Sequence, residues 1–111
     1  MTRVRVHPGA CGFTVTVEVT KKGEKGFAVQ LETECEMVAQ LAGELGDLTM
    51  MDAFKRFLDN PVYRKAATCL RHVACPVPSG ILKALEVEAG LNVPKNVTIT
   101  FLDDSEETGK S

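Results

Sequence analysis

The sequence has 111 residues, of which 44% are apolar, and a formal net charge of -2 at pH 7. This length corresponds to one domain with enough apolar side chains to build its own core. A weakly acidic chain lacks the basic surface of a general nucleic-acid-binding protein, and no run of about 20 apolar residues is present to span a bilayer. The composition therefore excludes nucleic acid and membrane as main partners and favours a cytoplasmic protein.

Three segments in the N-terminal third of the chain alternate between apolar and polar side chains, which is the pattern of half-buried β-strands. Residues 2–6 alternate briefly, residues 13–20 alternate over their whole length, and residues 27–33 supply a matching apolar face. A polar turn that contains glycine separates the last two segments. We therefore expect an N-terminal antiparallel sheet of three strands, two of them joined as a hairpin.

From residue 35 onward the apolar residues recur at helical spacing, and they predict four helices. The first helix is expected to run from Cys35 to Gly46, a residue type that commonly ends helices. The second is expected to begin near Thr49, and its inward face is formed by three large apolar side chains: Met51, Phe54 and Leu58.

The third and fourth predicted helices are indicated by their capping residues. Asn60-Pro61 combines an N-cap with proline at the first helical position, so the third helix is expected to begin there. Residues 75–78, Cys-Pro-Val-Pro, are expected to be non-helical because proline has no amide donor. The fourth helix is then expected from Ser79 to Ala89, with Gly90 as its end.

The C-terminal part of the chain is expected to return to the sheet and then to become irregular. Val97, Ile99 and Phe101 alternate with threonines as in a last strand, whereas residues 103–111 are polar and acidic, as in a disordered tail. The predicted protein is thus a single α+β domain over residues 1–102. It has a three-stranded antiparallel sheet, four helices packed on one face, and one C-terminal strand that joins the sheet.

The four cysteines are the strongest candidates for a functional site. Each lies where one predicted element ends or the next begins: Cys11, Cys35, Cys69 and Cys75. Cytoplasmic cysteines are mostly reduced, so they act as metal ligands or redox groups more often than as disulfides. Because loops and helix starts can converge at one end of a sheet, we expect these thiols to form one site.

The surroundings of these cysteines suit thiolates, the form of cysteine that binds metals. Cys35 and Cys75 precede predicted helices, whose N-terminal dipoles lower the pKa of a thiol. Glycines flank Cys11 and let backbone amides approach the sulfur. His72, which lies between Cys69 and the last cysteine, could replace one thiolate as a fourth ligand.

Several kinds of site are compatible with these residues. An iron–sulfur cluster and a zinc ion both accept cysteine and histidine ligands. A thiol redox enzyme would work through Cys69 and Cys75, and in a protein–protein adaptor all four thiols would be inert packing groups. The sequence contains no C-x-x-C pair, phosphate loop or Ser/His/Asp motif, so a binding protein is favoured over an enzyme.

In three places the chain resembles the U-type iron–sulfur cluster assembly scaffolds. The likeness consists of Cys11-Gly12 ahead of a hairpin, Cys35 at the start of a helix, and Cys75 ahead of a C-terminal helix, and it extends over about residues 1–90. The resemblance implies that these three cysteines hold an iron–sulfur cluster. It also implies a sulfur donor or a cluster-accepting protein as the partner.

Two positions depart from the pattern of those scaffolds. Phe13 stands where they carry an aspartate associated with cluster release, and Ala74 stands where they carry a histidine. The resemblance therefore leaves Cys69 or His72 as the fourth ligand, and it implies a site that retains its cluster more than it passes it on. The segment from Cys75 to Ala84 is also similar to small uncharacterised proteins of anaerobic archaea and bacteria, which adds no function.

Overall fold

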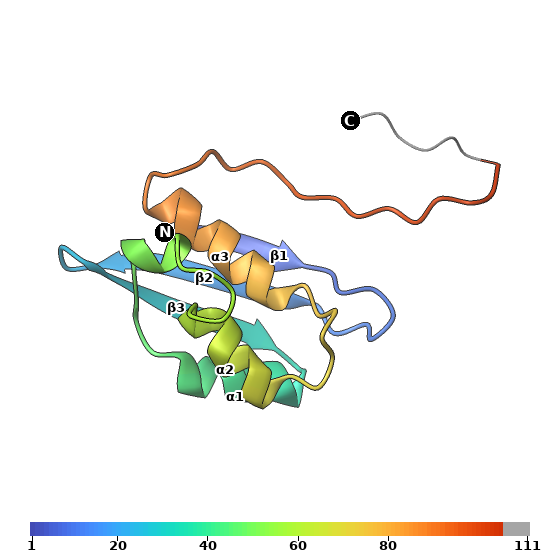
Figure 1. The fold of residues 1–111 in the computed structure, drawn as a ribbon, viewed down its shortest axis with the longest axis horizontal. Coiled ribbons are helices and arrows are strands. Elements are labelled where there is room, and N and C mark those ends of the chain that lie inside the picture. The colour runs from blue at the N-terminus through green and yellow to red at the C-terminus, as the bar shows by residue number, and fades with distance from the viewer. Residues whose placement is uncertain (106–111) are drawn as a thin grey trace.

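The described part of the chain, residues 1–105 of the computed structural model, forms an antiparallel sheet with helices packed on it (Figure 1). Four strands make up the sheet in the order β1-β2-β3-β4: β1 (Thr2–Val6), β2 (Val15–Lys22), β3 (Gly26–Thr33) and β4 (Leu48–Thr49). Three α-helices and one short 3-10 helix accompany it: α1 (Glu36–Leu45), η1 (Met50–Ala53), α2 (Pro61–Cys69) and α3 (Val77–Glu88). None of these helices is long and apolar enough to cross a membrane.

The first three strands form as their alternating side chains predict. Val15, Val17 and Val19 of β2 are fully buried, and the residues between them face the other side of the sheet. Val17 lies opposite Val4 of β1 on one side and Leu31 of β3 on the other, so one apolar face continues across three strands. The predicted hairpin and three-stranded core of the sheet are therefore confirmed.

The helices cover this apolar face. α3 lies against β1 and β2, α1 lies against β3, and α2 packs against both helices. Gly80 lets α3 approach the sheet closely, because a Cβ atom there would lie 2.6 Å from Cγ2 of Val6. At the other end of α3, the Glu88 carboxylate accepts hydrogen bonds from the Thr2 hydroxyl at 2.7 Å and the Lys21 amide at 3.0 Å. α3 is thus fixed to the sheet at both of its ends.

The α+β class is correct, but the predicted numbers of strands and helices are wrong. The sheet has four strands because Leu48 and Thr49 pair with Phe27 and Gly26. Within residues 1–105 there are three α-helices, since the predicted second helix is replaced by this short strand and by η1.

Hydrogen bonds of the following segment explain why no α-helix forms there. The Thr49 amide donates to the Asp52 carboxylate at 2.8 Å and closes a capping box on a single 3-10 turn. The buried Asn60 side chain then donates to the carbonyls of Asp52 and Lys55, at 2.7 and 3.2 Å. An α-helix would have used these carbonyls for its own ladder. Phe54 and other apolar side chains expected inside are consequently exposed.

The expected C-terminal strand is also absent from the described sheet. Residues 97–101 are extended but pair with no strand, and Ile99 and Phe101 are 85% and 98% exposed. Alternation predicts which side chains share a face, but it does not supply a partner strand. The predicted disordered tail covers residues 103–111, of which residues 106–111 lie outside the described part of the chain.

The remaining helices agree with their predicted caps, with one exception. α1 ends before Gly46, which has φ of 69°, and α2 begins at Pro61 with the Asn60 side chain accepting from the Val62 amide. α3, however, begins at Val77 instead of Ser79, so the Cys-Pro-Val-Pro segment is partly helical. Proline is tolerated there because first-turn amides have no intrahelical acceptor.

Candidate thiol site

The fold brings Cys11, Cys35 and Cys75 to the same end of the sheet. Val6, Val15 and Thr33 lie side by side in neighbouring strands. The loop that carries Cys11 joins the first two of these positions, and Cys35 follows the third by two residues and precedes α1.

The third cysteine reaches this end of the sheet through α3. Gly80, in the first turn of α3, lies against Val6, and Cys75 lies two residues before this helix begins. The three cysteines are thus far apart in the sequence but lie on three neighbouring connections. We call Cys11, Cys35 and Cys75 the thiol cluster.

Cys75 lies within electrostatic range of both Cys11 and Cys35. Burial raises the pKa of the Cys75 thiol most strongly, a hydrogen bond from the Val77 amide lowers it, and the charges of Cys11 and Cys35 raise it further. The pKa of Cys75 is therefore above its ordinary value. The expected effect of the helix N-terminus is present in the Val77 amide, but burial and like charges outweigh it at Cys75.

The thiol cluster fits a metal in ligand type but not yet in spacing. Cysteine sulfurs are preferred ligands of zinc and of iron–sulfur clusters. Among residues 1–105, however, no three Cys, His, Asp or Glu side chains are placed so that they could hold a metal ion. Cys11 and Cys35 thus each act on Cys75 through their charges, but the three thiols are not arranged as a metal-binding group in the described residues.

Cys11 is the most accessible member of the cluster. Its side chain is exposed, whereas those of Cys35 and Cys75 are partly buried. Gly9 and Gly12 on either side have φ of 87° and 75°, and the Gly12 amide donates to the Gly9 carbonyl at 2.9 Å. The Cys11 loop is therefore a tight, exposed turn over the end of the sheet.

Cys69 has a different environment from the other three cysteines. It is 5% exposed on the inward face of α2, and its sulfur donates a hydrogen bond to a Glu44 carboxylate oxygen of α1 at 3.4 Å. Its helical spacing from Val62 and Ala66, which are also buried, could have indicated a packing position. Cys69 is thus a buried residue in the contact between α1 and α2.

His72 lies in the exposed turn between α2 and α3, and its carbonyl accepts a hydrogen bond from the Cys75 amide at 3.3 Å. This bond ties the backbone of His72 to one member of the thiol cluster. His72 is the imidazole nearest in sequence to Cys75, whereas His7 has its Nδ1 3.4 Å from the Thr14 hydroxyl.

One shallow hollow on the sheet is lined by Gly12 and Glu34, the sequence neighbours of Cys11 and Cys35, but by no cysteine. It is formed between the Cys11 loop and the end of β3, and it is lined by Gly12, Phe13, Thr14, Thr16, Glu32, Thr33 and Glu34. The sequence alone did not indicate that Thr14 and Thr16 would line a hollow with these glutamates. The hollow is polar, and Glu32 and Glu34 give it an acidic border.

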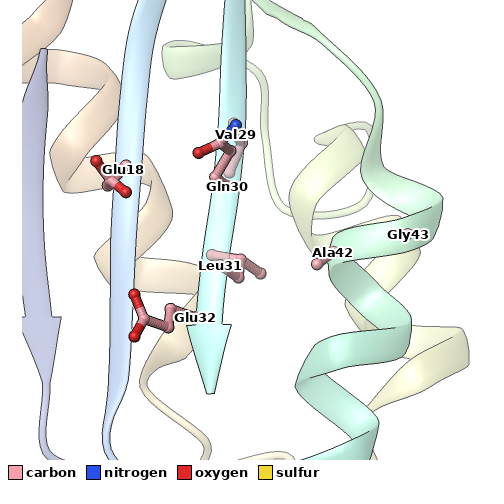
Figure 2. Close-up of a pocket in the computed structure, with 7 residues that line it drawn as sticks. All are labelled: Glu18, Val29, Gln30, Leu31, Glu32, Ala42 and Gly43. Atoms are coloured by element: carbon pink, nitrogen blue, oxygen red, sulfur yellow. The ribbon is translucent and has the colours of Figure 1, made fainter.

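The second hollow is a groove between β3 and α1 (Figure 2), lined by Glu18, Val29, Gln30, Leu31, Glu32, Ala42 and Gly43. It exists because β4 pairs only with Gly26 and Phe27, which leaves the rest of that edge of β3 without a strand. No cysteine lines this groove.

Comparison with known proteins identifies one related family. A sequence profile described as "Family of unknown function (DUF6951)" matches residues 2–101. No curated protein and no solved structure matches the chain.

Proposed function

We propose that this chain, which belongs to the DUF6951 family of unknown function, binds an iron–sulfur cluster. Its ligands would be Cys11, Cys35 and Cys75. One observation carries this proposal: the strand register and the contact of Gly80 with Val6 bring the connections that hold the three cysteines to one end of the sheet. Thiolates are the usual protein ligands of iron–sulfur clusters, so three neighbouring thiols at an accessible end of the sheet suit such a cargo.

The proposal assigns different parts to the three ligands. Cys35 and Cys75 are partly buried and held by the starts of α1 and α3, so they would form the fixed side of the site. Cys11 lies in an exposed turn, and within residues 1–105 the three cysteines do not form a ready metal-binding group. Closure of the Cys11 loop onto the other two cysteines is therefore part of the proposal.

We assign the fourth ligand to His72 in preference to Cys69. His72 is exposed and its backbone is bonded to that of Cys75. Cys69 is buried and donates to Glu44, so its use would require α2 to separate from α1.

The same residues support a carrier or scaffold in the cytoplasm, where thiols stay reduced. Its partners would be a sulfur donor or a cluster-accepting protein. Phe13 stands beside the cluster at the position for which the resemblance implies an aspartate, and it supports retention of the cluster over release.

Zinc is the second candidate for this site. Three thiolates and one imidazole are also a common tetrahedral zinc set. The thiols of Cys11, Cys35 and Cys75 would then serve a structural or regulatory zinc ion. A third candidate is an interaction module with inert cysteines, which is supported by the absence of a ready metal-binding group among residues 1–105.

Purification without oxygen, with assays of iron, sulfide and zinc and a visible spectrum, tests this proposal. We expect iron and sulfide with broad absorption near about 400 nm. Cys69→Ser is the matched control and should retain the cluster, whereas Cys11→Ser, Cys35→Ser or Cys75→Ser should each lose most of it. Zinc with the same dependence on the cysteines would establish the second candidate. Protein that stays free of metal after reconstitution would contradict both.

A further inference from the structure

A second surface with exposed apolar side chains is formed by residues 50–58, which we call the apolar loop. Several large apolar side chains of this segment point into solvent, and Phe54, Phe57 and Leu58 are 62%, 71% and 88% exposed. Contiguous exposed apolar residues of this size are uncommon on proteins without a binding partner at that place.

The apolar loop has a defined conformation. The Asp52 carboxylate accepts from the Thr49 amide, and the buried Asn60 side chain holds the carbonyls of Asp52 and Lys55. The Phe57 ring lies 5.0 Å from the ring of Tyr63, centroid to centroid. A surface fixed in this way loses little conformational freedom when it binds.

The chain also carries a segment that could occupy such a surface. Residues 97–102, which we call the C-terminal segment, are extended and exposed, and their backbone makes no hydrogen bond to another residue of the described chain. Val97, Ile99 and Phe101 are 64%, 85% and 98% exposed. Two exposed apolar surfaces are therefore present in one chain.

The position of the C-terminal segment favours the apolar loop of another molecule. η1 packs against α3, and the chain leaves the end of α3 and runs along the outside of the molecule (Figure 1). A segment that runs outward in this way is placed to reach a neighbour.

Charge selects the apolar loop over the other open surface. The exposed basic side chains in the apolar loop or shortly after it outnumber the two carboxylates there, Asp52 and Asp59. These basic residues are Lys55, which is ion-paired with Asp52 at 2.8 Å, and Arg56, Arg64 and Lys65. The C-terminal segment is followed by Asp103 and Asp104 and, in the sequence, by two glutamates. The groove between β3 and α1 instead carries Glu18 and Glu32, which would repel this acidic end (Figure 2).

We infer that the apolar loop binds the C-terminal segment of a second copy of this chain. In a symmetric pair each copy gives one segment and receives one, so the two contacts are identical. The apolar side chains of the segment cover the phenylalanines and leucine of the loop, and the acidic residues after it face the basic ones. This contact lies apart from the thiol cluster and does not depend on a bound cluster.

Sedimentation of the full-length chain over a range of concentrations tests this inference. We expect a concentration-dependent dimer. Phe101→Asp and Leu58→Asp change side chains that are already 98% and 88% exposed, so both variants should fold, and each should raise the dissociation constant at least about tenfold. Val73→Asp is the matched control, because Val73 is 103% exposed and lies outside both surfaces.

A charge exchange then tests the orientation of the contact. Arg56→Glu and Asp104→Lys should each weaken the dimer, and the two together should restore at least part of it. A chain that is monomeric at every concentration would overturn the inference, and so would a dimer that tolerates both Phe101→Asp and Leu58→Asp. Cross-links between the segment and the loop of the same molecule would overturn it as well.

Discussion

Cys75 shows how strongly the surroundings of one residue alter the chemistry expected from its position in the sequence. The residue lies just before α3, where the amide of Val77 stabilises a thiolate. Burial acts in the opposite direction and is the larger effect, and the neighbouring thiols add to it. The thiol is therefore protonated over a wider range of pH than an ordinary cysteine.

The two neighbouring thiols should be detectable through Cys75 in the absence of any metal. Because Cys11 and Cys35 raise the pKa of Cys75, their joint replacement by serine should lower it. Iodoacetamide labelling of Cys75, followed by mass spectrometry between about pH 7 and pH 10, measures this change. We expect the midpoint of labelling to move to lower pH in Cys11→Ser/Cys35→Ser and to stay unchanged in Cys69→Ser. Equal midpoints in all three proteins would mean that the thiols do not interact.

The sequence was informative about the members of the thiol cluster for a physical reason. A cysteine just after a strand lies at an end of the sheet, which applies to Cys35, whereas Cys75 reaches that end because α3 packs on Val6 through Gly80. Cys69 required knowledge of the neighbouring helix, because only the packing of α2 on α1 brings its sulfur to Glu44. The spacing between the sulfurs also depends on packing and loop conformation, which no pattern of residue types encodes.

At the scale of single elements, the contact between α3 and the sheet depends on Gly80. A Cβ atom at this position would lie 2.6 Å from a methyl group of the buried Val6, which is too short and stiff to move aside cheaply. Overpacking of this kind costs about 1–3 kcal/mol, while alanine returns up to about 1 kcal/mol of helix propensity. The clash should therefore decide the sign.

Urea unfolding of Gly80→Ala tests this argument. We expect the free energy of unfolding to fall by about 1 kcal/mol or more. Gly43→Ala in α1 is the matched control, because a Cβ atom there would meet nothing within 4 Å and its φ is ordinary. That variant should gain about 0.5–1 kcal/mol. A stabilised Gly80→Ala protein would show that α3 can shift away from β1.

Elements that depend on local signals were predicted well. The hairpin of β2 and β3 follows from alternation and a polar turn, and α2 follows from Asn60-Pro61. The α-helix predicted after Thr49 does not form, because the side chain of Asn60 donates to the Asp52 carbonyl, which a helix would use for its own hydrogen bonds. A side chain that interferes in this way is not visible in the spacing of apolar residues.

At the scale of the whole molecule, the fold differs from the predicted one where contacts between distant parts of the chain decide which segments pair. β4 joins the sheet because Leu48 and Thr49 reach the end of β3, and residues 97–101 stay outside it although their alternation is clear. Strand propensity is a property of a segment, whereas pairing requires an available edge at the right place. The partner of a terminal segment therefore cannot be predicted from its own sequence.

The central claim for the whole molecule is that Cys11, Cys35 and Cys75 can close around one metal centre. The strand register and the contact of Gly80 with Val6 place the connections of these cysteines at one end of the sheet, and closure would bring the three sulfurs onto one ion. Zinc is a suitable probe, because it binds sulfur and nitrogen ligands and its bonds to sulfur are clearly longer than its bonds to nitrogen. The two kinds of ligand can therefore be counted separately.

X-ray absorption spectroscopy of the zinc-loaded protein tests this claim most directly. We predict three sulfur ligands at about 2.3 Å and one nitrogen ligand at about 2.0–2.1 Å, assigned to His72. Cys75→Ser should reduce the number of sulfur ligands by one, and Cys69→Ser should leave it unchanged. A shell of oxygen and nitrogen atoms, or a sulfur count that falls only when Cys69 is replaced, would contradict the thiol cluster as the site.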